Sequence, residues 1–189
     1  MMKAPFLAAA LFAAAITLPA VAQDAMKKDV PVKPADSPSK VVLDTWNDVG
    51  RKIIAMAEDF PEDKYDFKPT PAQRSFAEQL LHAAGANYFF INPVIGQKLP
   101  EGDPKRDDYK TKADLVAYVK KSFADGAAVI QKKGDKGMSD LVVEPFAHQQ
   151  MRVGDLAYGF IEHLGEHYGQ LVVYYRIAGL VPPESRPKK

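Results

Sequence analysis

The chain has 189 residues, an almost balanced charge of +1 and no cysteine. This length suits one domain with a buried core, and the balanced charge gives no basis for a nucleic-acid partner or an anionic membrane surface. Without cysteine, no disulfide can stabilise the fold, and no thiolate can act as a metal ligand or nucleophile.

The first 22 residues have the pattern of a secretory signal peptide. Lys3 provides a short basic start, residues 4–20 form an apolar run, and Ala20-Val21-Ala22 matches the small-x-small site that signal peptidase cleaves. A membrane anchor is the alternative, but the run is shorter than the roughly 20 residues of a spanning helix and contains two prolines. We therefore expect cleavage after Ala22, no membrane span in the mature chain, and a periplasmic or secreted location.

The rest of the chain divides into a tether and one domain. Residues 23–39 contain three prolines among lysine, aspartate and serine and offer little to bury, so we expect a flexible tether. Residues 1–22 contain Lys3 and no acid, so the mature chain keeps 24 of the 25 basic residues and all 24 acidic ones. Residues 40–189 are predicted to form a single domain.

Four segments of this domain repeat their hydrophobic residues at steps of three and four, which is typical of helices. Ser75 with Glu78, and Thr111 with Asp114, match the pattern of a side-chain cap at a helix start. No segment alternates convincingly as a strand would. We therefore predict an all-α fold, a four-helix bundle. The predicted helices span residues 38–60, 76–91 (ending before Pro93), 111 to 134–137, and 153–155 to 179.

Two of the four histidines, His163 and His167, lie four residues apart in the last predicted helix. This spacing stacks their side chains on the apolar face that also carries Leu156, Phe160 and Leu171. Burial removes the water molecules bound to the nitrogens of two imidazoles, which costs free energy unless other partners replace them. A divalent metal ion would be such a partner. The alternative is a pair of ordinary core histidines bonded to carbonyl groups or water.

A third histidine, His82, lies in the middle of residues 76–91, the most apolar of the predicted helices. Three histidines on two helices of one bundle can form a facial triad, which leaves coordination positions open for water or substrate. The sequence therefore predicts a metal site made of His82, His163 and His167. Histidine nitrogens suit zinc, nickel, copper and iron alike, so the residues themselves leave the metal open.

Glu166, His148 and Gln170 are further candidates for this site. The residues His163-Leu-Gly-Glu-His167 match the H-x-x-E-H motif of inverted zinc proteases, but the chain lacks the length and the sheet of those large proteins. Glu166 is either a base or partner of a ligand, or a solvated surface acid. His148, in a predicted loop, is either a fourth ligand or substrate contact, or an ordinary surface residue. Gln170 is either a group that orients a ligand or simple helix surface.

The segments that carry the histidines resemble the DinB-like superfamily. They are Ser75-Phe-Ala-Glu-Gln-Leu-Leu-His82 and His163-Leu-Gly-Glu-His167-Tyr-Gly-Gln170, and the ending Arg176-Ile-Ala-Gly-Leu-Val-Pro-Pro-Glu-Ser is similar to that of exported members. The resemblance implies a bundle with up-down-down-up connectivity and a divalent ion, commonly zinc or nickel, on His82, His163 and His167. Several relatives are metal-dependent thiol transferases or isomerases that use cytosolic low-molecular-weight thiols, and many others have no known activity.

These observations leave three functions open. The first is an exported metal-dependent enzyme, hydrolase-like or transferring a thiol or similar group, that acts on an unknown small molecule. The second is a metal- or ligand-binding bundle without turnover, and the third is a structural bundle whose core histidines bind no metal. We expect no nucleic-acid partner, and a homodimer formed through helix faces is a further alternative.

Overall fold

The computed structural model describes residues 37–187. The predicted signal peptide, residues 1–22, and most of the predicted tether therefore lie outside the described residues. The first described helix begins at Pro38, so residues 38 and 39, the last of the predicted tether, are helical. Within residues 37–187, no helix is both long enough and apolar enough to cross a membrane.

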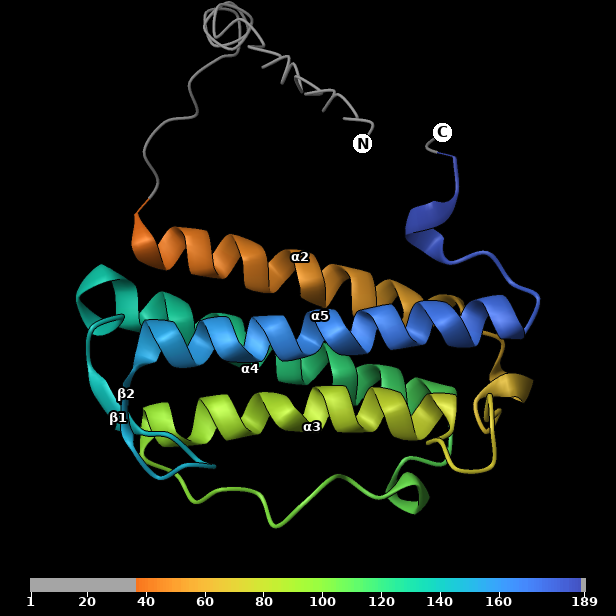
Figure 1. Cartoon of the computed structure of the whole chain (residues 1–189), viewed down its shortest axis with the longest axis horizontal. Helices are drawn as coiled ribbons and strands as arrows, with labels where there is room; N and C mark the ends of the chain where they lie inside the picture. Colours follow the sequence, from red (N-terminus) through yellow and green to blue (C-terminus); the bar gives the residue numbers. More distant parts are fainter. Residues whose placement is uncertain (1–36, 188–189) are drawn as a thin grey trace, which may run out of the picture. The chain divides into compact units, whose positions relative to one another are not determined.

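Four long helices form the domain: α2 (Pro38–Asp59), α3 (Phe76–Ile95), α4 (Lys112–Gly137) and α5 (Val153–Ile177). Both α2 and α3 pack against α4 and α5, so α2 and α3 lie diagonally opposite each other. In Figure 1, α2 and α5 run from left to right, whereas α3 and α4 run from right to left. The predicted all-α four-helix bundle is thus present. Because α3 and α4 point the same way, the connection between them returns along the length of the bundle.

Side-chain caps begin three of these helices, because the first N–H groups of a helix have no partner within it. The Ser37 side chain accepts from the backbone N–H of Lys40 at the start of α2. The two predicted caps are confirmed as full capping boxes at the starts of α3 and α4. They consist of Ser75 with Glu78 and of Thr111 with Asp114.

A glycine lets α2 and α4 approach closely around the single tryptophan. The indole N–H of Trp46 donates to the backbone carbonyl of Phe123 on α4, at 2.9 Å, within the core. A Cβ atom at Gly126 would lie 2.1 Å from the Trp46 ring, so only glycine leaves room for the indole there. Trp46 is fully buried, as its place on the apolar stripe of the first helix predicts.

The structure corrects two predicted element boundaries and one predicted absence. Pro93 lies inside α3, which continues to Ile95 and ends at Gly96 in the left-handed conformation. Pro93 has no backbone N–H, so the helix loses one hydrogen bond at this position. The helix nevertheless continues, and the extra turn buries Val94 in the core. Helix α5 ends at Ile177, two residues before Gly179.

A short antiparallel hairpin precedes α5, where the sequence predicted only a loop. It pairs β1 (Leu141–Val143) with β2 (Gln150–Arg152), and Val142 lies opposite Met151. Strands of three residues are too short to show the alternation by which a strand is recognised in a sequence. The hairpin covers one end of α3 and α5.

Candidate metal centre

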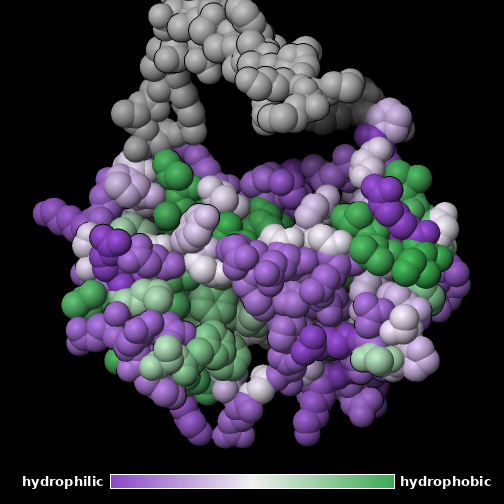
Figure 2. All heavy atoms as spheres, viewed as in Figure 1, coloured by the Kyte–Doolittle hydropathy of each residue, from purple (hydrophilic) through white to green (hydrophobic). Residues whose placement is uncertain are grey.

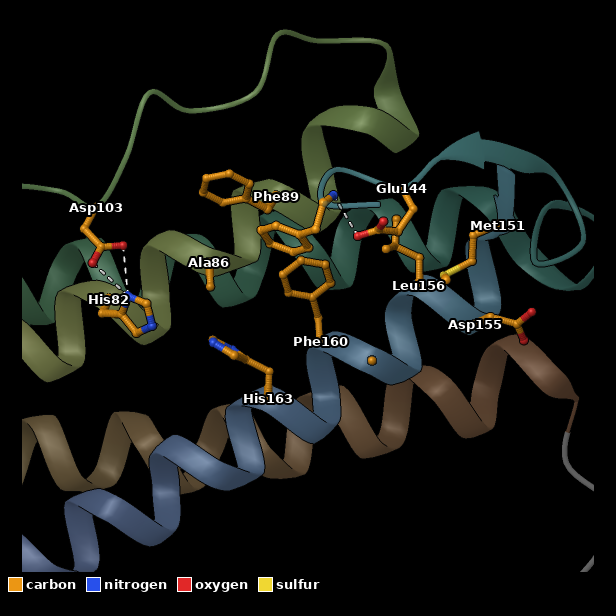
Figure 3. Close-up of a pocket in the computed structure, with 12 residues that line it drawn as sticks. His82, Ala86, Phe89, Asp103, Glu144, Met151, Asp155, Leu156, Phe160 and His163 are labelled. Carbon is orange, nitrogen blue, oxygen red and sulfur yellow. Dashed lines mark hydrogen bonds and ion pairs between the residues drawn. The ribbon is translucent and has the colours of Figure 1, made fainter. Parts of the chain in front are cut away.

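Three histidines from two helices meet in the bundle. His82 projects from α3, and His163 and His167 project from adjacent turns of α5. One ring nitrogen from each lies within 4.8 Å of the others. The ring centroids of His163 and His167 are 4.3 Å apart, and that of His82 lies 4.7 Å from the His167 centroid. Figure 3 shows His82 and His163 pointing toward one another from facing helices. The structure therefore brings together the three residues that the sequence singled out.

Asp103 sets the tautomer of His82. Both carboxylate oxygens of Asp103 lie within hydrogen-bond distance of His82 Nδ1, at 2.9 and 2.8 Å. A carboxylate only accepts, so Nδ1 carries a proton, and the neutral form of the ring then has its lone pair on Nε2. The same carboxylate–histidine pairing orients ligands in many metal sites. Asp103 lies on the long connection between α3 and α4, and no pattern in the sequence marks it as part of the site.

Two glutamines lie behind His167. Gln170 Oε1, one turn later on α5, lies 3.3 Å from His167 Nδ1. The amide nitrogen of Gln79 on α3 lies 2.5 Å from the same Nδ1 and donates to Gln170. Gln79 is buried, and from α3 it contacts both His167 and Gln170 on α5. In a neutral ring Nδ1 either donates to Gln170 Oε1 or accepts from the Gln79 amide, and only the first state leaves the lone pair on Nε2 for a ligand.

The third ring, His163, has a nitrogen without a partner. Its Nε2 lies 2.9 Å from His167 Nε2, so one of the two nitrogens must carry a proton if they share a hydrogen bond. Its Nδ1 is buried and has no hydrogen-bond partner within the described part of the chain. Buried polar atoms without partners are uncommon, and they point to a missing water, ligand or ion.

Burial keeps two of these rings neutral. It lowers the pKa of His163 below the ordinary 6.5, and the neighbouring His82 lowers it further. Burial, followed by the charges of His163 and His82, lowers the pKa of His167 to about 4. A metal ligand must be a neutral imidazole with a free lone pair. At neutral pH both α5 rings therefore have the protonation state that metal binding requires.

The arrangement fits a divalent metal ion. Histidine nitrogens bound tetrahedrally to zinc at about 2.0–2.1 Å lie about 3.3–3.4 Å apart, a few tenths of an ångström more than the 2.9 Å between the two α5 nitrogens. His82 and His167 each present Nε2 while Nδ1 bonds to a polar side chain, as ligating histidines do. Zinc, nickel, copper and iron all accept such a donor set.

A pocket of about 420 Å³ opens beside His82 and His163. The pocket runs between α3 and α5 toward the hairpin. Figure 3 shows Phe89, Phe160 and Leu156 further along it. On the face in Figure 2, hydrophobic residues gather left of centre, near the hairpin end of these two helices. The histidine cluster therefore lies at one end of a mainly apolar cavity, which is the usual form of a small-molecule site.

Two of the three further candidate residues, Glu166 and His148, lie away from the histidine cluster. Glu166 is exposed on α5 and is not among the residues that line the pocket. His148 is exposed in the hairpin turn, with a positive φ of 54°, and is not part of the histidine cluster. Of the residues weighed around the histidines, only Gln170 contacts one of them, His167.

The sequence and the fold both match known proteins. The model of the DinB superfamily matches residues 46–171. The crystal structure of a DinB-like protein from Bacillus cereus ATCC 10987 is similar, with a TM-score of 0.62 at 18% identity, over 75% of this chain and 93% of that one. A DinB-like protein from Bacillus subtilis has a TM-score of 0.61 at 19% identity, over 78% of this chain and 99% of that one. No curated protein matches the sequence. The chain belongs to the DinB superfamily.

Proposed function

We propose that His82, His163 and His167 hold one divalent metal ion, zinc or nickel, and that the protein is a metal-dependent enzyme acting on a small molecule. The observation that carries the proposal is the convergence of one nitrogen from each ring within 4.8 Å, at the end of a pocket. Three protein ligands leave coordination positions open, which is typical of catalytic rather than structural metal sites.

A divalent ion at this position supplies Lewis-acid chemistry, which polarises a carbonyl group or lowers the pKa of water or of a thiol. That chemistry suits a hydrolase-like reaction or the transfer of a thiol or similar group. Asp103 holds His82 in the correct tautomer, and Gln170 with Gln79 holds His167. The apolar walls of the pocket exclude water around the bound molecule.

A binding protein without turnover is the second candidate. Three acids line the pocket, and each already has a partner: Asp103 bonds to His82, Glu144 accepts backbone N–H groups, and Asp155 pairs with Arg152. The lining residues therefore include no unpaired carboxylate to act as a general base. This favours either a reaction that the metal drives without such a base, or binding alone.

The predicted signal peptide leads us to propose that the protein works in the periplasm or outside the cell. Its partner would be a small molecule, and nothing in the near-zero charge of the mature chain favours nucleic acid. Pairing of two copies through helix faces is an alternative that sedimentation or light scattering can test.

Elemental analysis of the protein isolated from its native compartment tests the metal. We expect about one equivalent of zinc or nickel per chain, and loss of that metal when the three histidines are replaced by alanine. The matched control is His148→Ala, which removes a histidine outside the cluster. Native protein without stoichiometric metal, or a triple variant that retains the metal, would contradict the proposal.

An activity screen then separates the enzyme from the binding protein. The metal-loaded protein is tested with ester, amide and thiol-transfer substrates, alongside protein stripped by a chelator. Turnover that disappears with the metal supports the enzyme. If turnover is absent across the screen while metal binding is stoichiometric, the binding function is favoured instead.

A further inference from the structure

Three phenylalanines, Phe89, Phe146 and Phe160, form an aromatic wall of the pocket beside the histidines. Phe89 from α3 and Phe146 from the hairpin turn stack with ring centroids 5.8 Å apart and planes 17° from parallel. Phe160 from α5 lies 6.4 Å from Phe146. Phe160 is buried, whereas Phe146 is 68% exposed although it lines the pocket. An exposed phenylalanine stacked at a pocket mouth offers a ring face that a bound apolar molecule would cover.

Glu144 fixes the position of Phe146. It is buried, and its carboxylate accepts from the backbone N–H of Phe146 at 2.9 Å and from that of Ala147. The carboxylate therefore folds the chain after β1 so that Phe146 turns toward Phe89. This use of Glu144 explains why a charged residue can lie in an apolar part of the structure.

The permanently charged side chains that line the pocket are all acids. The charged residues among its lining are the acids Asp103, Glu144 and Asp155, together with the titratable rings of His82 and His163; the lining contains no lysine or arginine. Arg152 pairs with Asp155 in an exposed ion pair, and Arg74 lies 3.5 Å from Asp103. A molecule that carried a negative charge along this pocket would therefore meet carboxylates without a lining cation to compensate.

We propose that this pocket selects a substrate with a neutral, aromatic or similarly apolar body, held between Phe89, Phe146 and Phe160, and with a metal-binding donor group at the histidine end. The volume of about 420 Å³ lies within the range of roughly 300–1,000 Å³ that is usual for small-molecule sites. The proposal deepens the proposed function and rests on it only for the donor group. Anionic substrates, such as carboxylated thiols or phosphate esters, are excluded from the body of the pocket.

Three hydroxamates test the proposal by titration calorimetry on the zinc-loaded protein. Acetohydroxamate carries the metal-binding head alone, benzohydroxamate adds a neutral ring, and 4-carboxybenzohydroxamate adds a carboxylate to that ring. We expect benzohydroxamate to bind at least tenfold more tightly than acetohydroxamate, and the added carboxylate to remove that gain. Equal affinities for the first two would overturn the apolar pocket, and tight binding of the third would overturn its preference for a neutral body.

Two glycines of α5 provide a matched pair of variants. A Cβ at Gly159 would meet nothing within 4 Å, and this residue lines the pocket, so Gly159→Leu starts a larger side chain in open space beside the cavity. Gly169 on the same helix is equally open but is not among the residues that line this pocket. We expect Gly159→Leu to weaken benzohydroxamate at least tenfold and leave acetohydroxamate unchanged, whereas Gly169→Leu changes neither. Phe146→Ala at the exposed turn should weaken benzohydroxamate about tenfold. If Gly159→Leu and Gly169→Leu bind benzohydroxamate alike, the proposed place of the ring is wrong.

Indole separates failure of the pocket from failure of the metal site, because it is neutral, aromatic and without a strong metal-binding group. Saturation-transfer NMR on metal-free protein should detect indole with wild type and with Gly169→Leu, and not with Gly159→Leu. If no metal is retained but this pattern holds, the proposed metal site fails and the apolar pocket stands. If zinc binds as proposed but indole is not detected with wild type, the pocket proposal is overturned.

Discussion

Pro104 packs directly on the backbone of Gly85, so a Cβ atom at Gly85 would lie 2.6 Å from Pro104 Cδ. Gly85 lies one turn after His82 on α3, and Pro104 follows Asp103. The long connection between α3 and α4 is thus seated on the helix beside the histidine cluster. This contact explains why Asp103, on a loop, reaches the His82 ring with both carboxylate oxygens.

We expect Gly85→Ala to weaken metal binding although residue 85 is not a ligand. The added methyl group must displace Pro104, which moves Asp103 away from His82 and removes the hydrogen bond that orients the ring. Loss of such a partner typically costs about 10–100-fold in metal affinity. Zinc affinity measured by competition with a chromophoric chelator tests this expectation.

The control for this substitution is Gly102→Ala, on the same loop, where a Cβ would meet nothing within 4 Å. It should bind zinc as the wild type does. Unchanged zinc affinity in Gly85→Ala would show that the loop can shift without disturbing His82, and the seating role of Gly85 would then be wrong.

Asp103→Asn isolates the carboxylate from the position of the loop. Asparagine has nearly the same shape, and its carbonyl can still accept from His82 Nδ1, but it no longer carries a charge. We expect zinc affinity to fall by about tenfold or more, which is ~1.4 kcal/mol for each factor of ten. Asp107→Asn removes an exposed acid from the same connection and serves as the control. A similar loss in both variants would indicate a general charge effect instead of the Asp103–His82 bond.

The histidines of the site could be predicted from the sequence because they obey local rules. Spacing by four places His163 and His167 on one helix face, and His82 lies in an apolar helix that must face the core. Asp103 and Gln79 could not be predicted in this way. Asp103 reaches the site because of the path of a long loop, and Gln79 because of the register between α3 and α5. Neither the loop path nor the register produces a periodic pattern in the sequence.

The fold shows the same division. Helix starts were predictable where the capping residues stand three apart, as at Ser75 and Glu78. The end of α3 was not, because burial of Val94 outweighs the hydrogen bond that Pro93 removes. The hairpin escaped prediction because each strand has three residues. Where the local sequence signals are weak, tertiary contacts determine where an element ends and whether it forms.

The stability of the metal-free protein should depend on pH through His167. This group titrates at about 4 in the folded protein and near 6.5 in the unfolded chain. Between these values only the unfolded chain takes up the proton, so falling pH favours unfolding. The free energy of unfolding should therefore be fully present above about pH 7 and lose about 3 kcal/mol from this group as the pH falls toward 4. The lowered pKa of His163 acts in the same direction.

Urea unfolding of chelator-treated protein at several pH values measures this effect. His167→Gln removes the titrating group, and subtracting its pH profile from that of the wild type cancels the carboxylates common to both. The difference should be flat above pH 7 and decline below it. A difference that stays constant from pH 7.5 to pH 4.5 would mean that His167 accepts its proton in the folded state without cost.

His148→Gly should stabilise the protein and leave its metal content unchanged. His148 adopts a positive φ of 54° in the hairpin turn, a conformation that strains side chains with a Cβ atom but not glycine. We expect a gain of about 0.5–1 kcal/mol in the free energy of unfolding, measured with urea at neutral pH. The metal content should remain one equivalent, because His148 is exposed and outside the histidine cluster. Loss of metal in this variant would instead make His148 a fourth ligand supplied by movement of the hairpin, and the three-histidine description of the site would have to be replaced.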